Sequence, residues 1–137
     1  MRSPSRPTSV RRGAVAVEAA LVLPVLLMLT FGLIEFGHYL YLQHMIKGAA
    51  QAGARTAIPA GVTNDATART AISDMMSAAG IDPGQYSVSF SPAVSAATPG
   101  TRIEVSISCT WQTVGIRPLG LISPTKQVRG FAVMQKE

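Results

Sequence analysis

The chain has 137 residues, of which 47% are hydrophobic and 14% are charged, and its mean hydropathy is positive, at +0.29. This length allows one domain with an appendage and excludes a large multidomain enzyme. Soluble domains carry about 25% charged residues, so part of this chain is expected to face something other than water. So apolar a composition also excludes disorder along the whole chain.

The net charge of +5 is distributed unevenly. The first 13 residues contain four basic side chains and no acidic one: Arg2, Arg6, Arg11 and Arg12. The remaining 124 residues hold 8 Lys and Arg against 7 Asp and Glu. Because no basic stripe with interleaved aromatic residues is present, the sequence does not predict a nucleic-acid surface. A short basic head on a nearly neutral body is typical of a membrane anchor with a cytoplasmic N-terminus.

Residues 14–34 form an apolar segment in which 17 of 21 residues are apolar and positions 19–34 carry no charge. As a helix, this segment would span about 31 Å, the thickness of a bilayer core. The alternative, a buried core helix, is disfavoured because so short a chain has little material to cover it. The four arginines before the segment, and the distance to the next basic residue at Lys47, predict a cytoplasmic N-terminus and an external remainder.

Four aromatic residues gather at the outer end of this segment. Two roles are equally compatible with them, anchoring at the membrane interface and packing against an outer domain. The four residues are Phe31, Phe36, Tyr39 and Tyr41. A removable secretory signal is disfavoured, because the apolar run exceeds the usual 7–15 residues, contains Glu18 and is not closely followed by an A-x-A site.

Two residues inside the apolar segment are unusual. Glu18 places a carboxylate in a spanning helix, which is disfavoured by about 2.5–3.5 kcal/mol near the centre and by less near an edge. It is either a group that reaches the inner interface or a charge that seeks a cationic partner in a helical assembly. Pro24 removes the hydrogen bond to the carbonyl of Ala20, so it produces either a harmless kink or a weak point at which the helix partly unwinds.

The run RRGAVAVEAALVLPVLLMLTFGLIEFGHYLYLQHMIKGAAQAGARTA, residues 11–57, resembles the N-terminal signature of the TadE-like family. These proteins are minor pilins, or pseudopilins, of the tight-adherence (Flp) pilus machinery. In that family a prepilin peptidase cuts after a glycine that ends the basic leader, and glutamate occupies the fifth mature position. The resemblance implies that Gly13 precedes the cut, Ala14 becomes the new N-terminus and Glu18 is the fifth residue. Ala19 departs from the pattern, since an aromatic residue commonly follows the glutamate.

The resemblance implies a role in pilus biogenesis rather than catalysis, with Glu18 fixing register against the free amine of a neighbouring subunit. The implied partners are the prepilin peptidase, other pilin and minor pilin subunits, the inner-membrane pilus assembly platform and the lipid bilayer. The implied location is the bacterial inner membrane, as a single-pass protein, or the pilus itself. The alternative is a permanently anchored single-pass envelope protein whose outer domain binds a partner.

The sequence predicts an α+β fold with three parts: a basic leader (1–13), a membrane helix with its outward extension (14–58) and a small outer domain (59–137). Small residues fill the extension of the helix, and pairs such as Ala49 and Gly53 allow close approach either of another helix or of the protein's own sheet. In the outer domain we expect a helix over 65–79, with an apolar stripe and with Thr63 or Asn64 as its cap. About three strands are expected, at 86–91, at 102–111 (including Trp111) and near 127–135, where the buried face of the last strand is undetermined.

The sequence predicts no enzyme, cofactor or metal site. His38 and His44 are six residues apart and would point in different directions on a helix. The single cysteine, Cys109, excludes an intrachain disulfide and fits a small buried hydrophobic residue of the central strand. Glu18 and Glu35 would lie about 25 Å apart along a helix, too far for paired-carboxylate catalysis.

Overall fold

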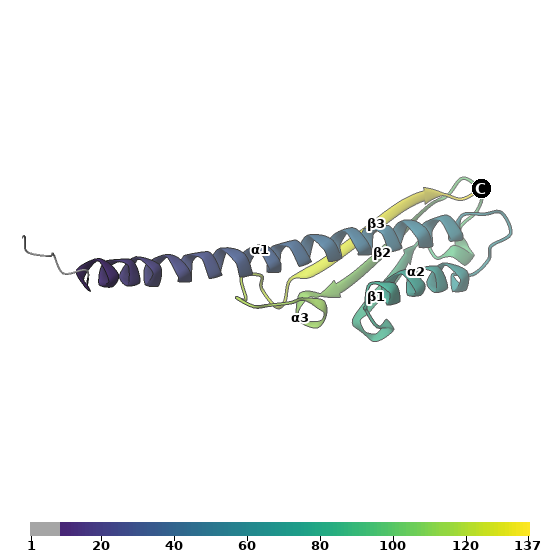
Figure 1. The fold of residues 1–137 in the computed structure, drawn as a ribbon. Coiled ribbons are helices and arrows are strands. Elements are labelled where there is room, and N and C mark those ends of the chain that lie inside the picture. Colours follow the sequence, from purple (N-terminus) through teal and green to yellow (C-terminus); the bar gives the residue numbers. More distant parts are fainter. Residues whose placement is uncertain (1–8) are drawn as a thin grey trace, which may run out of the picture.

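A computed structural model describes residues 9–137 of the chain, with side chains from residue 13 onward. Arg2 and Arg6 of the predicted leader lie outside the described residues, and the side chains of Arg11 and Arg12 are not described. The fold is α+β, as predicted: a long N-terminal helix, a shorter second helix and a three-stranded antiparallel sheet (Figure 1).

Helix α1 (Ser9–Ala57) is continuous over 49 residues and extends about 73 Å at 1.5 Å per residue. Its N-terminal half projects away from the rest of the molecule, and its C-terminal half lies along the sheet (Figure 1). The helix passes through Pro24 and ends just before Pro59, within one residue of the predicted end. Gly61, with φ of 89°, then allows the chain to reverse direction.

Helix α2 (Ala66–Ala78) packs on α1 through an apolar stripe of which Ala68, Ile72 and Met76 are fully buried. The N-cap residue is Asp65 rather than the predicted Thr63 or Asn64, and the Asn64 side chain just before it accepts a hydrogen bond from the Ala66 N–H at 3.2 Å. Gly80, with φ of 76°, follows its end. The spacing of these residues predicts the stripe, and its buried side chains form part of the hydrophobic core between α1 and α2.

The sheet has the order β1-β2-β3, formed by β1 (Tyr86–Ser91), β2 (Arg102–Thr110) and β3 (Gln127–Gln135). Period-2 alternation gives it one apolar face against α1, with these β2 side chains fully or almost fully buried: Ile103, Val105, Ile107 and Cys109. The opposite face is polar on β1 and β2, where serine pairs share hydrogen bonds, and carries the exposed Phe131 and Val133 on β3. The buried face of β3, which the sequence leaves undetermined, is that of Val128, Gly130 and Ala132.

Two glycines bring main chains into close contact. A Cβ atom added at Gly130 would lie 2.7 Å from the Lys47 backbone nitrogen, so β3 rests directly against the backbone of α1. A Cβ atom added at Gly53 would lie 2.5 Å from Ile72 Cδ1. The small residues of the helix extension therefore pack within this chain, against α2 and the sheet.

Trp111 does not continue β2, contrary to the prediction. It begins a short helix, α3 (Trp111–Val114), where the Gln112 N–H donates to the Pro124 carbonyl at 3.0 Å and the Gly115 N–H donates to the Trp111 carbonyl at 2.8 Å. The indole remains fully buried, 5.5 Å from the Tyr39 ring in an edge-on arrangement. Two 3₁₀ helices that were not predicted, Pro83–Gln85 and Val94–Ala96, flank β1.

Candidate functional site

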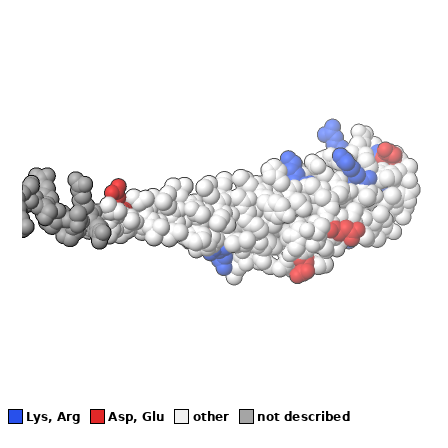
Figure 2. Space-filling model, in the orientation of Figure 1, with Lys and Arg blue, Asp and Glu red and all other residues white. Residues whose placement is uncertain are grey.

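The N-terminal half of α1 is apolar and uncovered in the single chain. Thirteen large apolar side chains between Val15 and Ile34 are 39–70% exposed. On the face shown in Figure 2 this stretch is a white rod with one acidic group near its start, and the other coloured charges lie beyond it toward the outer domain. Among the described residues one helix, over Gly13–Ala57, is long and apolar enough to cross a membrane by length and composition. Such a helix fits a single-pass membrane anchor.

The four residues that the sequence singles out all lie on this exposed rod. Gly13 and Ala14 are in the first turns of the described helix, with exposed side-chain positions. Glu18 is exposed one turn further along, on the face of Ala14. Pro24 is exposed as well, inside an unbroken helix. The structure therefore gathers these residues on one element, and cleavage and assembly at them remain predictions.

Glu35 is a residue whose role the sequence analysis missed. Its side chain is fully buried even though it is charged. It is the first charged residue after a run of 16 uncharged residues. One carboxylate oxygen accepts a hydrogen bond from the Ile122 N–H at 2.9 Å, and the other accepts one from the Leu119 N–H at 3.3 Å. The carboxylate thus ties the loop between α3 and β3 to the outer end of the apolar rod. An isolated acidic residue immediately after the apolar segment was the available signal.

The two histidines lie apart, as their spacing predicts. His38 is half-buried, and its Nε2 lies 3.2 Å from the Val114 carbonyl oxygen, within hydrogen-bond distance. His44 is exposed and lines a shallow groove beside Lys47 and Arg129. Within residues 9–137, no three His, Cys, Asp or Glu side chains are grouped so as to hold a metal ion.

Cys109 is the small buried residue that the strand pattern predicts. It is 3% exposed, and burial raises the pKa of its thiol to about 11 from the usual 9.0. The thiol is therefore protonated at neutral pH, which argues against a nucleophilic role.

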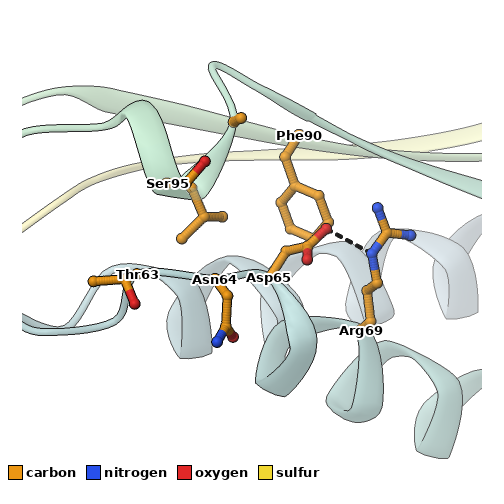
Figure 3. A pocket seen from close by; sticks show the side chains of 8 residues that line it. Thr63, Asn64, Asp65, Arg69, Phe90 and Ser95 are labelled. Carbon is orange, nitrogen blue, oxygen red and sulfur yellow. Dashed lines mark hydrogen bonds and ion pairs between the residues drawn. The ribbon is translucent and has the colours of Figure 1, made fainter.

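A small pocket lies at the far end of the molecule, between the start of α2 and β1 (Figure 3). It has a cavity volume of about 260 Å³. Its two charged side chains satisfy each other, since Arg69 Nε donates to Asp65 Oδ2 at 2.6 Å, and the guanidinium lies over the Phe90 ring at 5.3 Å. The side chain of Arg69 is 51% exposed and that of Asp65 is 38% exposed, so the pair is a surface contact rather than an activated catalytic group.

Comparison with known proteins addresses α1 alone. The family model described as TadE-like protein matches residues 13–55, which cover the exposed rod and most of the part of α1 that packs on the outer domain. No curated protein and no solved structure matches the chain. The match confirms the resemblance seen in the sequence: residues 13–55 are similar to the TadE-like family, which is consistent with a TadE-like protein of the Tad pilus system.

Proposed function

We propose that this chain is a minor pilin or pseudopilin that takes part in building a tight-adherence pilus. The TadE-like match suggests a role in Tad pilus assembly, and the uncovered apolar rod supports the more specific assignment. TadE-like proteins are structural components of the pilus system, and we propose no catalytic activity for this chain.

The exposed rod is the observation that carries the proposal. Burying its 13 large apolar side chains is worth on the order of 10–20 kcal/mol, so the rod is stable only in lipid or among other helices. A bilayer holds the subunit before assembly, and a bundle of pilin helices replaces the lipid during assembly. The same surface thus serves anchoring and polymerisation in turn.

Cleavage between Gly13 and Ala14 makes the rod ready for assembly in this proposal. The prepilin peptidase removes the basic leader, and the new Ala14 amine carries a positive charge. Glu18 of a neighbouring subunit pairs with that amine, which compensates both charges in apolar surroundings. Pro24 loosens the helix one to two turns further along, where the rod adjusts as it leaves lipid.

The remaining partners and the location follow from this scheme. The subunit contacts other pilin and minor pilin subunits and the assembly platform of the inner membrane. It is a single-pass protein of that membrane, with its N-terminus in the cytoplasm and its outer domain on the other side.

N-terminal sequencing of the protein isolated from its host membrane tests the proposal. Ala14 is the expected first residue, and Gly13→Leu is expected to retain the leader. A wild-type protein that begins at Met1, in cells whose other pilins are processed, would instead be the permanently anchored envelope protein.

The assembly step has its own test in the variant Glu18→Ala. Membrane insertion should be unchanged, because removing a charge favours the lipid-embedded state, whereas incorporation into pili should fall. Glu104→Ala, which removes an exposed carboxylate of the outer domain, is the matched control. Normal piliation by Glu18→Ala would reduce Glu18 to a tolerated edge residue.

A further inference from the structure

The loop over residues 115–126, which joins α3 to β3, extends beyond the sheet along α1 toward the apolar rod (Figure 1). Leu121 of this loop lies beside the rod, since its Cδ1 is 3.4 Å from the position of a Cβ atom added at Gly32. The loop therefore reaches the last turn of the predicted membrane span, residues 14–34.

The loop exposes apolar side chains although it belongs to the outer domain. Ile116 is 52% exposed, Leu119 is 39% exposed and Leu121 is 68% exposed. Among the described residues outside α1, Phe131 and Val133 are the other large apolar side chains with such exposure. Three of these five side chains thus lie in one loop, at the end of the domain nearest the membrane span.

From this placement we propose that the loop is a second membrane-contacting element, with Ile116, Leu119 and Leu121 immersed at the surface of the outer leaflet. The proposal rests on the membrane anchoring of α1 proposed above. We infer that lipid covers these three side chains because they are continuous with the apolar rod. Leu121 lies beside Gly32, and Gly32 belongs to the segment 14–34 that the bilayer surrounds. Phe36 and Leu40 of α1, both exposed, continue the apolar surface beyond the rod along the helix.

The buried carboxylate of Glu35 explains how a loop can occupy this position. A backbone N–H group that loses water at the edge of the bilayer without gaining a partner is strongly disfavoured. Glu35 accepts from the N–H groups of Leu119 and Ile122, so two donors of the loop are satisfied inside the protein. Their side chains are then free to face lipid or the core: Leu119 is exposed, and Ile122 packs against the hydrophobic core.

The charge of the loop also fits this arrangement. Arg117 is exposed and stands between the apolar residues Ile116 and Leu119. A long basic side chain beside immersed apolar groups can extend to lipid phosphates while its methylene groups remain in contact with the apolar layer.

Fluorescence quenching on the full-length protein in phosphatidylethanolamine–phosphatidylglycerol vesicles tests the proposal. A cysteine introduced by Leu121→Cys carries an environment-sensitive fluorophore, and the buried Cys109 remains unlabelled in the folded protein. Ser77→Cys, at an exposed position of α2, is the control in the outer domain, and Leu26→Cys reports insertion of α1. Quenchers are lipids with a spin label near the headgroup, and aqueous iodide.

We expect the probe at Leu121 to be quenched several-fold more by the lipid spin label than the probe at Ser77, and several-fold less by iodide. Equal quenching by iodide at the two positions would overturn the proposal while Leu26 remained quenched by lipid, so membrane anchoring would stand. Protection from iodide without quenching by lipid would mean that protein covers the loop, which also overturns it. Loss of lipid quenching at Leu26 would refute the anchoring and the loop contact together.

Glu35→Ala supplies a second variant. With Trp111 fluorescence unchanged, which reports an intact core, lipid quenching of the Leu121 probe should fall while that of the Leu26 probe stays the same. Unchanged quenching at Leu121 would mean that Glu35 does not position the loop.

Discussion

Gly130→Ala is the substitution for which the structure gives the clearest expected magnitude. The added methyl group would lie 2.7 Å from the backbone nitrogen of Lys47 and 2.8 Å from the carbonyl carbon of Ile46. Both atoms belong to the backbone of α1 and cannot move without the helix. Reaching an ordinary contact of 3.4 Å requires about 0.7 Å more room, so β3 must shift away from α1.

Overpacking of this kind costs about 1–3 kcal/mol of stability, and we expect Gly130→Ala to lower the free energy of unfolding by that amount. Gly37→Ala is the matched control, because a Cβ atom there has nothing within 4 Å and the residue lies within a helix. Alanine is the better helix former, so this control should raise stability by about 0.5–1 kcal/mol.

Urea unfolding of the full-length protein in detergent micelles measures both changes. Trp111 is the single tryptophan and is fully buried, so its fluorescence reports loss of the core. The midpoint of Gly130→Ala should move to lower urea and that of Gly37→Ala to higher urea. If the two variants unfold at the same midpoint as the parent protein, β3 and α1 are not in backbone contact.

Three further predictions concern the outer domain. Lys136→Met should lower stability by about 1–3 kcal/mol in the same urea assay, because the buried ammonium donates to the carbonyls of Val62 and Val94 at 2.7 and 3.2 Å; no change would mean that water replaces it. Asp65→Asn should change stability by less than about 1 kcal/mol, since the ion pair with Arg69 is exposed, and a larger loss would show the pair to be structural. Burial raises the pKa of Cys109 from 9.0 to about 11, so its contribution to stability is complete below pH 9 and is lost as the pH rises toward 11. Cys109→Ala should flatten that part of the pH profile, and an identical alkaline decline in both proteins would contradict it.

Local patterns were sufficient to predict most of the fold. Strict alternation from Ile103 to Cys109 identified the central strand and its buried face, and helical spacing identified the stripe of α2. The last strand carries apolar residues on both faces, so its orientation depends on a tertiary fact, the contact of Gly130 with α1. Trp111 continues the alternation but begins α3, and the turn there includes a backbone hydrogen bond from Gln112 to Pro124 that the alternation does not encode.

In the candidate site too, local features were predictable from the sequence and contacts between distant residues were not. The apolar run and the family motif are local features. The sequence alone therefore predicts the apolar rod and its similarity to the TadE-like family. The processing and assembly roles of Gly13, Ala14, Glu18 and Pro24 stay predictions, as does the division into leader, anchor and outer domain. The position of Glu35 after the apolar segment marks it as unusual, but its partners Leu119 and Ile122 are more than 80 residues away along the chain and could not be predicted from local patterns.

Because α1 is one unbroken helix, the directions in which side chains point at its two ends are fixed relative to each other. Each helical residue advances the chain by about 100° around the axis, so the direction in which Glu18 points is set relative to the sheet that covers Ile46. Inserting a single residue between them would swing the outer domain by about 100° and displace it by about 1.5 Å. In the proposed assembly, as long as α1 stays unbroken through Pro24, the subunit that pairs with Glu18 therefore sets the direction in which the sheet faces.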